Sequence, residues 1–219
     1  MITDEVSLNA SLMFSLLCFS VEYCPSSCII IGLMAKIFIF RHGQTIDNLE
    51  HDFSGIHDVD LTQAGIDEAI QIGEKLKDEA VTKAYQSEQI RSQHTLALVL
   101  NGWHKNVRIF TDVRIRERDY GDLTGFSKDE LKKIDPKDFA LWHRSYTVPP
   151  PHGESLQTVE KRVLEFLHDN IPTWNSEDII FVSAHSNSIR PMRRYFEKMA
   201  IEEMCSYEYT PGQIFEYQI

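Results

Sequence analysis

The chain has few cysteines, and most of them lie together near its start. Only four are present, at Cys18, Cys24, Cys28 and Cys205. The body of the chain therefore carries no disulfide framework, which indicates a reducing, cytoplasmic environment. Cys24 and Cys28 on their own suggest metal ligands, but no second Cys or His pair follows them at a suitable spacing. We therefore expect no metal site.

Basic residues are also scarce, because 22 Lys and Arg face 33 Asp and Glu and leave a net charge of -11. Non-specific nucleic-acid binding needs a basic surface that displaces counterions, so the composition argues against a nucleic-acid partner. An anionic substrate requires instead that the few cations gather in one pocket. The cations that fall within or beside the motifs described below are Arg41, Arg91, Arg116, Arg118, Lys128, Arg144 and Arg190.

The first 33 residues contain no Lys or Arg at all. A secretory signal needs a positive first region and a mitochondrial presequence needs arginines, so neither is indicated. The apolar patches at residues 12–21 and 29–33 are too short and interrupted to span a bilayer, although weak membrane association is an alternative. Met34-Ala35-Lys36 reads like a natural start. We expect residues 1–33 to be a non-essential extension or an upstream-start artefact, and residues 34–219 to form one domain.

From Lys36 onward the sequence alternates between strand and helix patterns. Such an alternation favours a layered α/β fold with a mostly parallel sheet, in which ligands gather at the carboxyl ends of the strands. The apolar spacing predicts helices over residues 62–77, 89–101 and 155–170, the last with an N-cap serine. Strands are predicted over residues 36–40, 84–86, 107–110, 179–183 and 214–218.

Two histidines follow predicted strands directly. His42 stands in Arg41-His42-Gly43-Gln44 after residues 36–40, and His185 follows the apolar residues 179–182. One pocket can therefore hold both imidazoles. Arg41 supplies a fixed guanidinium whose paired donors match phosphate oxygens, and Gly43 allows a close approach of the backbone.

Further residues complete a set suited to phosphoryl transfer through a phosphohistidine. Arg91 follows the second predicted strand, and Glu117 lies in a charged stretch that ends at Gly121. Asn187, Ser188 and Arg190 begin a predicted helix, whose N-terminus favours anions. In such chemistry one imidazole attacks, the cations stabilise the transferring oxygens, and the carboxyl group exchanges a proton with the alcohol.

The motif Arg41-His42-Gly43-Gln44-Thr45 resembles the signature of the histidine phosphatase, or phosphoglycerate mutase-like, superfamily. Residues 36–219 resemble most closely its bisphosphoglycerate-dependent phosphoglycerate mutases. This resemblance implies a three-layer α/β/α sandwich with a mostly parallel central sheet. The matching stretches are residues 41–48, 53–62, 117–121 with Leu123 and Gly125, Lys128, 142–151, 153–156 and 184–190.

The resemblance also implies roles. It predicts interconversion of 3-phosphoglycerate and 2-phosphoglycerate, primed by 2,3-bisphosphoglycerate and without a metal, and a homo-oligomer is frequent in the family. The implied catalytic residues are His42, Glu117, His185, Arg41 and Arg91. The implied substrate-binding residues are Gly43, Gln44, Thr45, Asn48, Ser54, Gly55, Arg118, Asp119, Tyr120, Lys128, His143, Arg144, Ser186 and Asn187.

Three departures from the family pattern matter. His143-Arg144 stands where larger mutases have paired arginines, Ser186 replaces a usual glycine, and the long insertion after Pro151 is missing. The missing insertion leaves the site more open to water, which favours a phosphomonoesterase as the alternative function. A non-catalytic phospholigand-binding protein is a third hypothesis, weakened because no residue of the catalytic set is substituted.

Overall fold

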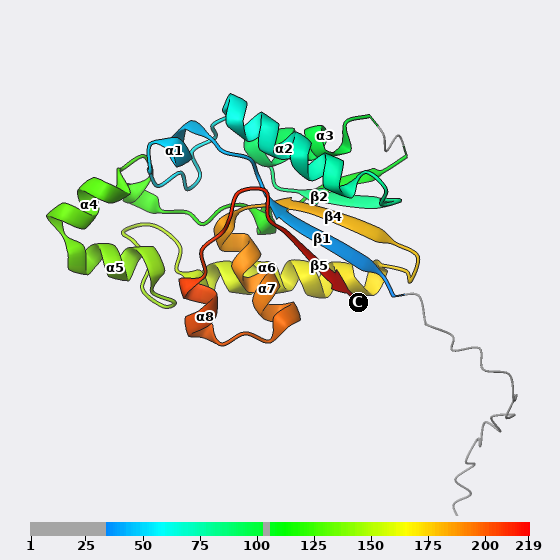
Figure 1. Cartoon of the computed structure of the whole chain (residues 1–219). Helices are drawn as coiled ribbons and strands as arrows, with labels where there is room; N and C mark the ends of the chain where they lie inside the picture. The colour runs from blue at the N-terminus through cyan, green and yellow to red at the C-terminus, as the bar shows by residue number, and fades with distance from the viewer. Residues whose placement is uncertain (1–33, 103–105) are drawn as a thin grey trace, which may run out of the picture. The chain divides into compact units, whose positions relative to one another are not determined.

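A five-stranded sheet runs through the part of the chain that the computed structural model describes, residues 34–102 and 106–219 (Figure 1). Its order is β3-β2-β4-β1-β5. All neighbouring strands are parallel except β5, which runs antiparallel to β1. The mostly parallel sheet is therefore confirmed. The strands are β1 (Lys36–Arg41), β2 (Lys83–Gln86), β3 (Arg108–Thr111), β4 (Ile179–Ala184) and β5 (Ile214–Gln218).

Helices cover both faces of the sheet, which confirms the three-layer α/β/α sandwich. One face carries α2 (Gln63–Leu76) and α3 (Ile90–Leu100), as Figure 1 shows. The other face carries α6 (Leu156–Asn170) and α7 (Ser186–Glu197). Each strand and helix predicted from the sequence is present, and no predicted end differs from the observed one by more than one residue.

The two helical layers explain why the central strands are apolar on both sides. In β1, Ile37 and Ile39 pack into the cluster that α6 and α7 cover, whereas Phe38 and Phe40 pack against α2 and α3. A strand buried on both faces reads as a continuous apolar run rather than an alternation. Each such side chain contributes roughly 1.5–3 kcal/mol when it leaves water, so these layers hold the ends of β1 and β4 in place.

Helix α6 begins where its serine predicts. Ser155 is the N-cap, and its Oγ accepts a hydrogen bond of 3.0 Å from the backbone N–H of Thr158. This bond satisfies one of the free donors of the first turn. The side chains that α6 turns inward include those expected from the spacing: Val159, Val163, Phe166 and Leu167.

Several short elements have no counterpart in the sequence prediction. Helices α1, α4 and α5 lie beyond the carboxyl ends of the parallel strands (Figure 1). Neither α4 nor α5 has a fully buried residue, so neither shows the apolar periodicity on which the prediction depends. The additional helices are α1 (Ile46–Leu49), α4 (Lys128–Ile134), α5 (Pro136–Arg144), α8 (Ile201–Ser206) and the 3-10 helices Val113–Ile115, Gly121–Leu123 and Ile171–Thr173.

Some expectations fall outside the described residues. Residues 1–33, with Cys18, Cys24 and Cys28, are among them, so the proposed extension stays a prediction. Cys205 is a buried free thiol. Within residues 34–102 and 106–219, no helix is long and apolar enough to cross a membrane. A cytoplasmic location and a homo-oligomer likewise stay predictions.

Candidate active site

The pairing of β1 with β4 places His42 at the carboxyl end of the parallel strands. The backbone N–H of His42 donates to Ala184 at 3.0 Å, which extends the β1–β4 pairing by one residue. Gly43 follows, and a Cβ at that position would lie only 2.2 Å from the carbonyl oxygen of Gly65. Only glycine fits this close approach of two backbones, so the loop after β1 sets where the imidazole stands.

The His42 ring has a defined proton arrangement. Its Nδ1 lies 2.7 Å from the backbone oxygen of Gly43. A carbonyl oxygen only accepts, so Nδ1 carries the proton and Nε2 keeps its lone pair. Burial, reinforced by Arg41 and Arg91, holds the pKa of His42 well below its usual value. The ring is therefore neutral, which is the form that a nucleophile needs.

His185 lies beside His42 at the N-terminus of α7. The ring centroids are 5.0 Å apart and the planes are tilted by 53°. The Nε2 atom of His185 lies 2.7 Å from the hydroxyl of Ser87, which already accepts a bond from the N–H of Gln89. A Ser87 hydroxyl that donates to Nε2 places the ring proton on Nδ1. That Nδ1 is buried and has no hydrogen-bond partner among the described residues, so in this tautomer it is a donor available to a ligand.

Glu117 is held by three N–H groups that share one carboxylate oxygen. Its Oε1 accepts from the backbone of Arg118 at 2.7 Å and from the side chain and backbone of Asn187 at 2.9 and 3.3 Å. The backbone N–H of Glu117 itself donates to Gln89 at 2.8 Å. No described residue donates to Oε2. The carboxylate is therefore fixed through one oxygen and offers the other for proton transfer.

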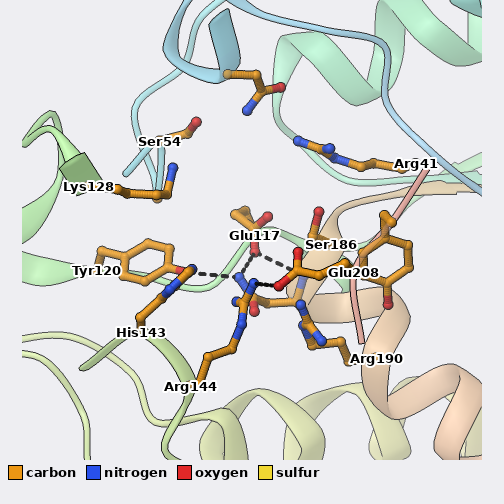
Figure 2. Close-up of a pocket in the computed structure, with 14 residues that line it drawn as sticks. Arg41, Ser54, Glu117, Tyr120, Lys128, His143, Arg144, Ser186, Arg190 and Glu208 are labelled. Atoms are coloured by element: carbon orange, nitrogen blue, oxygen red, sulfur yellow. Dashed lines mark hydrogen bonds and ion pairs between the residues drawn. The ribbon is translucent and has the colours of Figure 1, made fainter. Parts of the chain in front are cut away.

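A cavity of about 260 Å³ opens beside these groups (Figure 2). Four cations and two carboxylates line it, in a protein whose net charge is -11. Four basic side chains thus gather at one cavity, as an anionic ligand requires. The lining residues are Arg41, Asn48, Ser54, Gly55, Glu117, Tyr120, Lys128, His143, Arg144, Ser186, Asn187, Arg190, Glu208 and Tyr209.

Burial lowers the pKa of one of these cations, Lys128. The Nζ of Lys128 donates to the backbone oxygen of Asp52 and lies 5.1 Å from the ring centroid of Phe53. Loss of solvent, with a smaller contribution from Arg41, lowers the pKa of Lys128 to about 8. Lys128 is therefore charged at neutral pH, with a titration close enough to be measured.

His143 and Arg144 are the last two residues of α5, and their side chains have different partners. The His143 ring lies 4.9 Å from the ring of Phe139 and 5.7 Å from that of Phe53. Burial, and then the charge of Arg144, lowers the pKa of His143 to about 3, so the ring is neutral. The Nη2 of Arg144 donates to Oε1 of Glu208 at 2.6 Å.

A second cavity, of about 170 Å³, reaches His42 from another side. It shares Arg41 and Asn48 with the first cavity, which Glu117 lines and His42 does not. The imidazole and the carboxylate thus stand in adjacent spaces with a common wall. The residues of the second cavity are Arg41, His42, Gln44, Asn48, Glu68, Thr210, Pro211 and Gly212.

Some of the predicted site residues build the walls instead of facing the cavities. Arg91 is fully buried and donates to the backbone oxygens of His57 and Gly55, at 2.6 and 2.9 Å. Arg118 donates its Nε to Glu154 at 2.7 Å. Asp119 accepts from the N–H of Gly121 within a turn. Thr45 is the N-cap of α1, and its Oγ1 accepts from the backbone N–H of Asn48. The roles implied for these residues stay predictions.

Other residues of the site escaped the sequence prediction. Arg190, a cation beside a motif that the predicted site does not include, lines the cavity and donates to the backbone oxygen of Met204 at 2.7 Å. Ser87 contacts Nε2 of His185, and the side-chain oxygen of Gln89 accepts from the backbone N–H of Glu117. Both precede Arg91, which is the only residue of this stretch that the sequence predicts for the site. Glu208 and Tyr209 have no motif around them, so no signal in the sequence could have found them.

Known proteins share the sequence pattern of this chain over most of its length. Residues 37–219 match the family described as "Histidine phosphatase superfamily (branch 1)". A protein of Nitrobacter hamburgensis named 2,3-bisphosphoglycerate-dependent phosphoglycerate mutase is 38% identical over 188 residues, which are 84% of this chain and 91% of that protein. A protein of the same name from Rhizobium meliloti is 36% identical over 192 residues, which are 85% of this chain and 91% of that protein.

Solved structures share the fold. YhfR of Bacillus stearothermophilus superposes with a TM-score of 0.74 at 26% identity, over 83% of this chain and 90% of that one. The alpha-ribazole phosphatase of Shigella flexneri has a TM-score of 0.72 at 23% identity, over 83% of this chain and 89% of that one. The same three-layer scaffold therefore carries more than one named activity.

Proposed function

Because this chain belongs to the histidine phosphatase superfamily, branch 1, we propose that it is a phosphoglycerate mutase that interconverts 3-phosphoglycerate and 2-phosphoglycerate. The observation that carries the proposal is the cavity lined by Arg41, Lys128, Arg144 and Arg190. The transfer of a single phosphoryl group does not need four cations. A ligand with a phosphate, a carboxylate and a second phosphorylated position does, because each anionic group requires its own donors.

The first half of the reaction uses His42 as the nucleophile. Its neutral Nε2 attacks phosphorus, the N–P bond forms, and the ester P–O bond breaks. The Nδ1–H of His185 and the guanidinium of Arg41 donate to the phosphoryl oxygens, where negative charge spreads in the transition state. Glu117 gives a proton from Oε2 to the departing alkoxide, so the alcohol leaves neutral.

The second half transfers the phosphoryl group from the phosphohistidine to the free hydroxyl of a monophosphorylated substrate, which gives a doubly phosphorylated species. Glu117, now ionised, takes the proton of that hydroxyl, and the oxygen attacks phosphorus as the N–P bond breaks. The doubly phosphorylated species must then turn round without escaping, so that its other phosphate faces His42. Lys128, Arg144 and Arg190 hold it during this turn, which is why a mutase needs more cations than a hydrolase.

The site also fits the priming ligand of such enzymes. Buried donors without a partner among the described residues include Nε of Arg41, Nε of Arg190 and Nδ1 of His185. Donors of this kind suit a ligand with several anionic groups. When bound, 2,3-bisphosphoglycerate supplies the phosphoryl group that charges His42. No group of three His, Cys, Asp or Glu in the described part of the chain is arranged to hold a metal, and a metal-free reaction stays a prediction.

The proposal is tested by measuring 2-phosphoglycerate formation from 3-phosphoglycerate with and without catalytic 2,3-bisphosphoglycerate, while free phosphate is recorded in parallel. We expect fast isomerisation that depends on the bisphosphate and releases little phosphate. Phosphate release without isomerisation would refute the mutase.

A phosphomonoesterase is the second candidate, and one observation favours it. His42 lines the second cavity but not the first, which carries the cations for the phosphoglycerate. Water that enters there can attack a phosphohistidine in place of the hydroxyl of the phosphoglycerate. The same assay separates the two functions, because water as acceptor yields free phosphate and leaves no second isomer.

A further inference from the structure

The rim of the main cavity carries an ion pair that the mechanism above does not use. Arg144, at the end of α5, donates Nη2 to Oε1 of Glu208 at 2.6 Å (Figure 2). Glu208 stands between α8 and β5, 64 residues along the chain from its partner. The Glu208 side chain is 76% exposed, whereas that of Arg144 is 27% exposed. An exposed carboxylate thus forms an ion pair with a cation that lines the cavity.

Arg144 differs in this respect from the other cations of the cavity. Lys128 and Arg190 donate to backbone carbonyls. Among the described residues, no carboxylate forms an ion pair with Lys128, Arg190 or Arg41. Their charges are therefore left for a ligand, while the charge of Arg144 is already matched by an acid of this chain. Glu208 thus occupies a donor of Arg144 that the carboxylate of a ligand could otherwise use.

Just before Glu208, the backbone N–H of Tyr207 donates to the backbone oxygen of Glu203 at 3.1 Å, while the side chain of Glu208 has a single partner among the described residues. Tyr209 lies against the guanidinium of Arg190, whose central carbon is 5.3 Å from the Tyr209 ring centroid. The backbone oxygen of Gly212 accepts from Lys75 at 3.2 Å. Glu208 can therefore release Arg144 by rotating its own side chain, without a rearrangement of the segment.

We propose that Glu208 is a specificity-determining residue that competes with the ligand carboxylate for Arg144. The proposal rests on the proposed function, because it takes the ligand to be a phosphoglycerate. A carboxylated phosphate ester must displace Glu208 before it gains Arg144. An ester whose remaining groups are neutral leaves the ion pair intact. Glu208 therefore lowers the affinity for carboxylated esters relative to neutral ones, which speeds their release.

Two ligands with the same three-carbon skeleton test this directly. Binding of 3-phosphoglycerate and of glycerol 3-phosphate, which has no carboxylate, is measured by calorimetry on the whole unprimed protein and on its Glu208→Gln variant. We expect the affinity for 3-phosphoglycerate to rise about twofold to fivefold relative to that for glycerol 3-phosphate, as for an exposed ion pair. Glu202→Gln, an exposed carboxylate on α8 outside the cavity, is the control for net charge and should leave this ratio unchanged.

A double-mutant cycle separates competition at Arg144 from a general effect of charge. In an Arg144→Gln background, Glu208→Gln should no longer change the ratio of the two affinities. An equal gain for both ligands, or a gain that persists without Arg144, would overturn the proposal. Isomerisation is assayed separately, so a protein that binds 3-phosphoglycerate but does not isomerise it refutes the mutase alone. A protein that does not bind 3-phosphoglycerate refutes both.

Discussion

The imidazoles of His42 and His185 lie side by side, with ring centroids 5.0 Å apart, because β1 and β4 are parallel neighbours in the sheet. Arg41 is paired with Ala184 in the β1–β4 register, so the next residue of each strand leaves the sheet at the same edge. Two histidines that are 143 positions apart in the sequence thus share one environment, in which burial keeps both rings neutral.

Replacing His42 with alanine should abolish the phosphoenzyme. The Nε2 lone pair is the nucleophile, and no other described imidazole has an Nδ1 that hydrogen-bonds to a backbone oxygen. Labelling with a radioactive phosphoryl donor, followed by acid-labile phosphate counting, measures the effect. His94→Ala, which removes an exposed imidazole paired with Asp60, is the control and should keep full labelling. Labelling that survives in His42→Ala would remove His42 from the mechanism.

Glu117→Gln should slow kcat by about 10²- to 10⁴-fold while changing ligand affinity little. Glutamine keeps an oxygen that accepts from Arg118 and Asn187 but supplies no exchangeable carboxyl proton. Steady-state kinetics and direct binding of 3-phosphoglycerate separate the two effects. Equal losses in rate and in affinity would argue that Glu117 only shapes the cavity.

His143→Arg should raise the ratio of mutase to phosphatase activity. The native ring is neutral, with a pKa of about 3, so arginine adds a cation to the ligand cavity. It must also fit between Phe53 and Phe139, beside Arg144, and we expect unfolding free energy to fall by about 1–3 kcal/mol. Parallel assays and urea unfolding measure the two effects, with His143→Gln as the neutral control. An unchanged ratio would mean that His143 does not influence the balance between mutase and phosphatase activity.

Binding of 3-phosphoglycerate should weaken as pH rises through about 8. Burial lowers the pKa of Lys128 to about 8 in the folded protein, so Lys128 loses its charge there. The unfolded chain keeps this proton to about pH 10.4, so the same group makes folding more favourable between the two values as pH rises. A hydrogen bond to a charged group contributes about 1.5–3 kcal/mol, which predicts at least about a tenfold loss of affinity.

The control for this pH effect is Lys128→Arg, because a guanidinium stays protonated throughout the range. Calorimetry between pH 7 and 9.5 should give a flat profile for Lys128→Arg and a falling one for the unaltered protein. The same fall in both proteins would assign the titration to another group.

The elements with strong periodicity were predictable, and those without it were not. Strands β1 and β4 are apolar on both faces, and α6 places Val159, Val163 and Phe166 on one stripe, so local sequence identifies them. Helices α4 and α5 bury no residue fully, so their sequence carries no such pattern. They nevertheless supply Lys128, His143 and Arg144 to the cavity.

The sequence by itself determined the chemistry of this protein: the order of strands and helices, the two histidines at strand ends, and the family to which the chain belongs. Only the tertiary structure decided how individual groups are used. It directs Arg91 to backbone carbonyls, keeps His143 neutral and pairs Arg144 with Glu208. The physical reason is that periodicity and motifs are local properties, whereas burial and ion pairing depend on which distant segments the fold brings together.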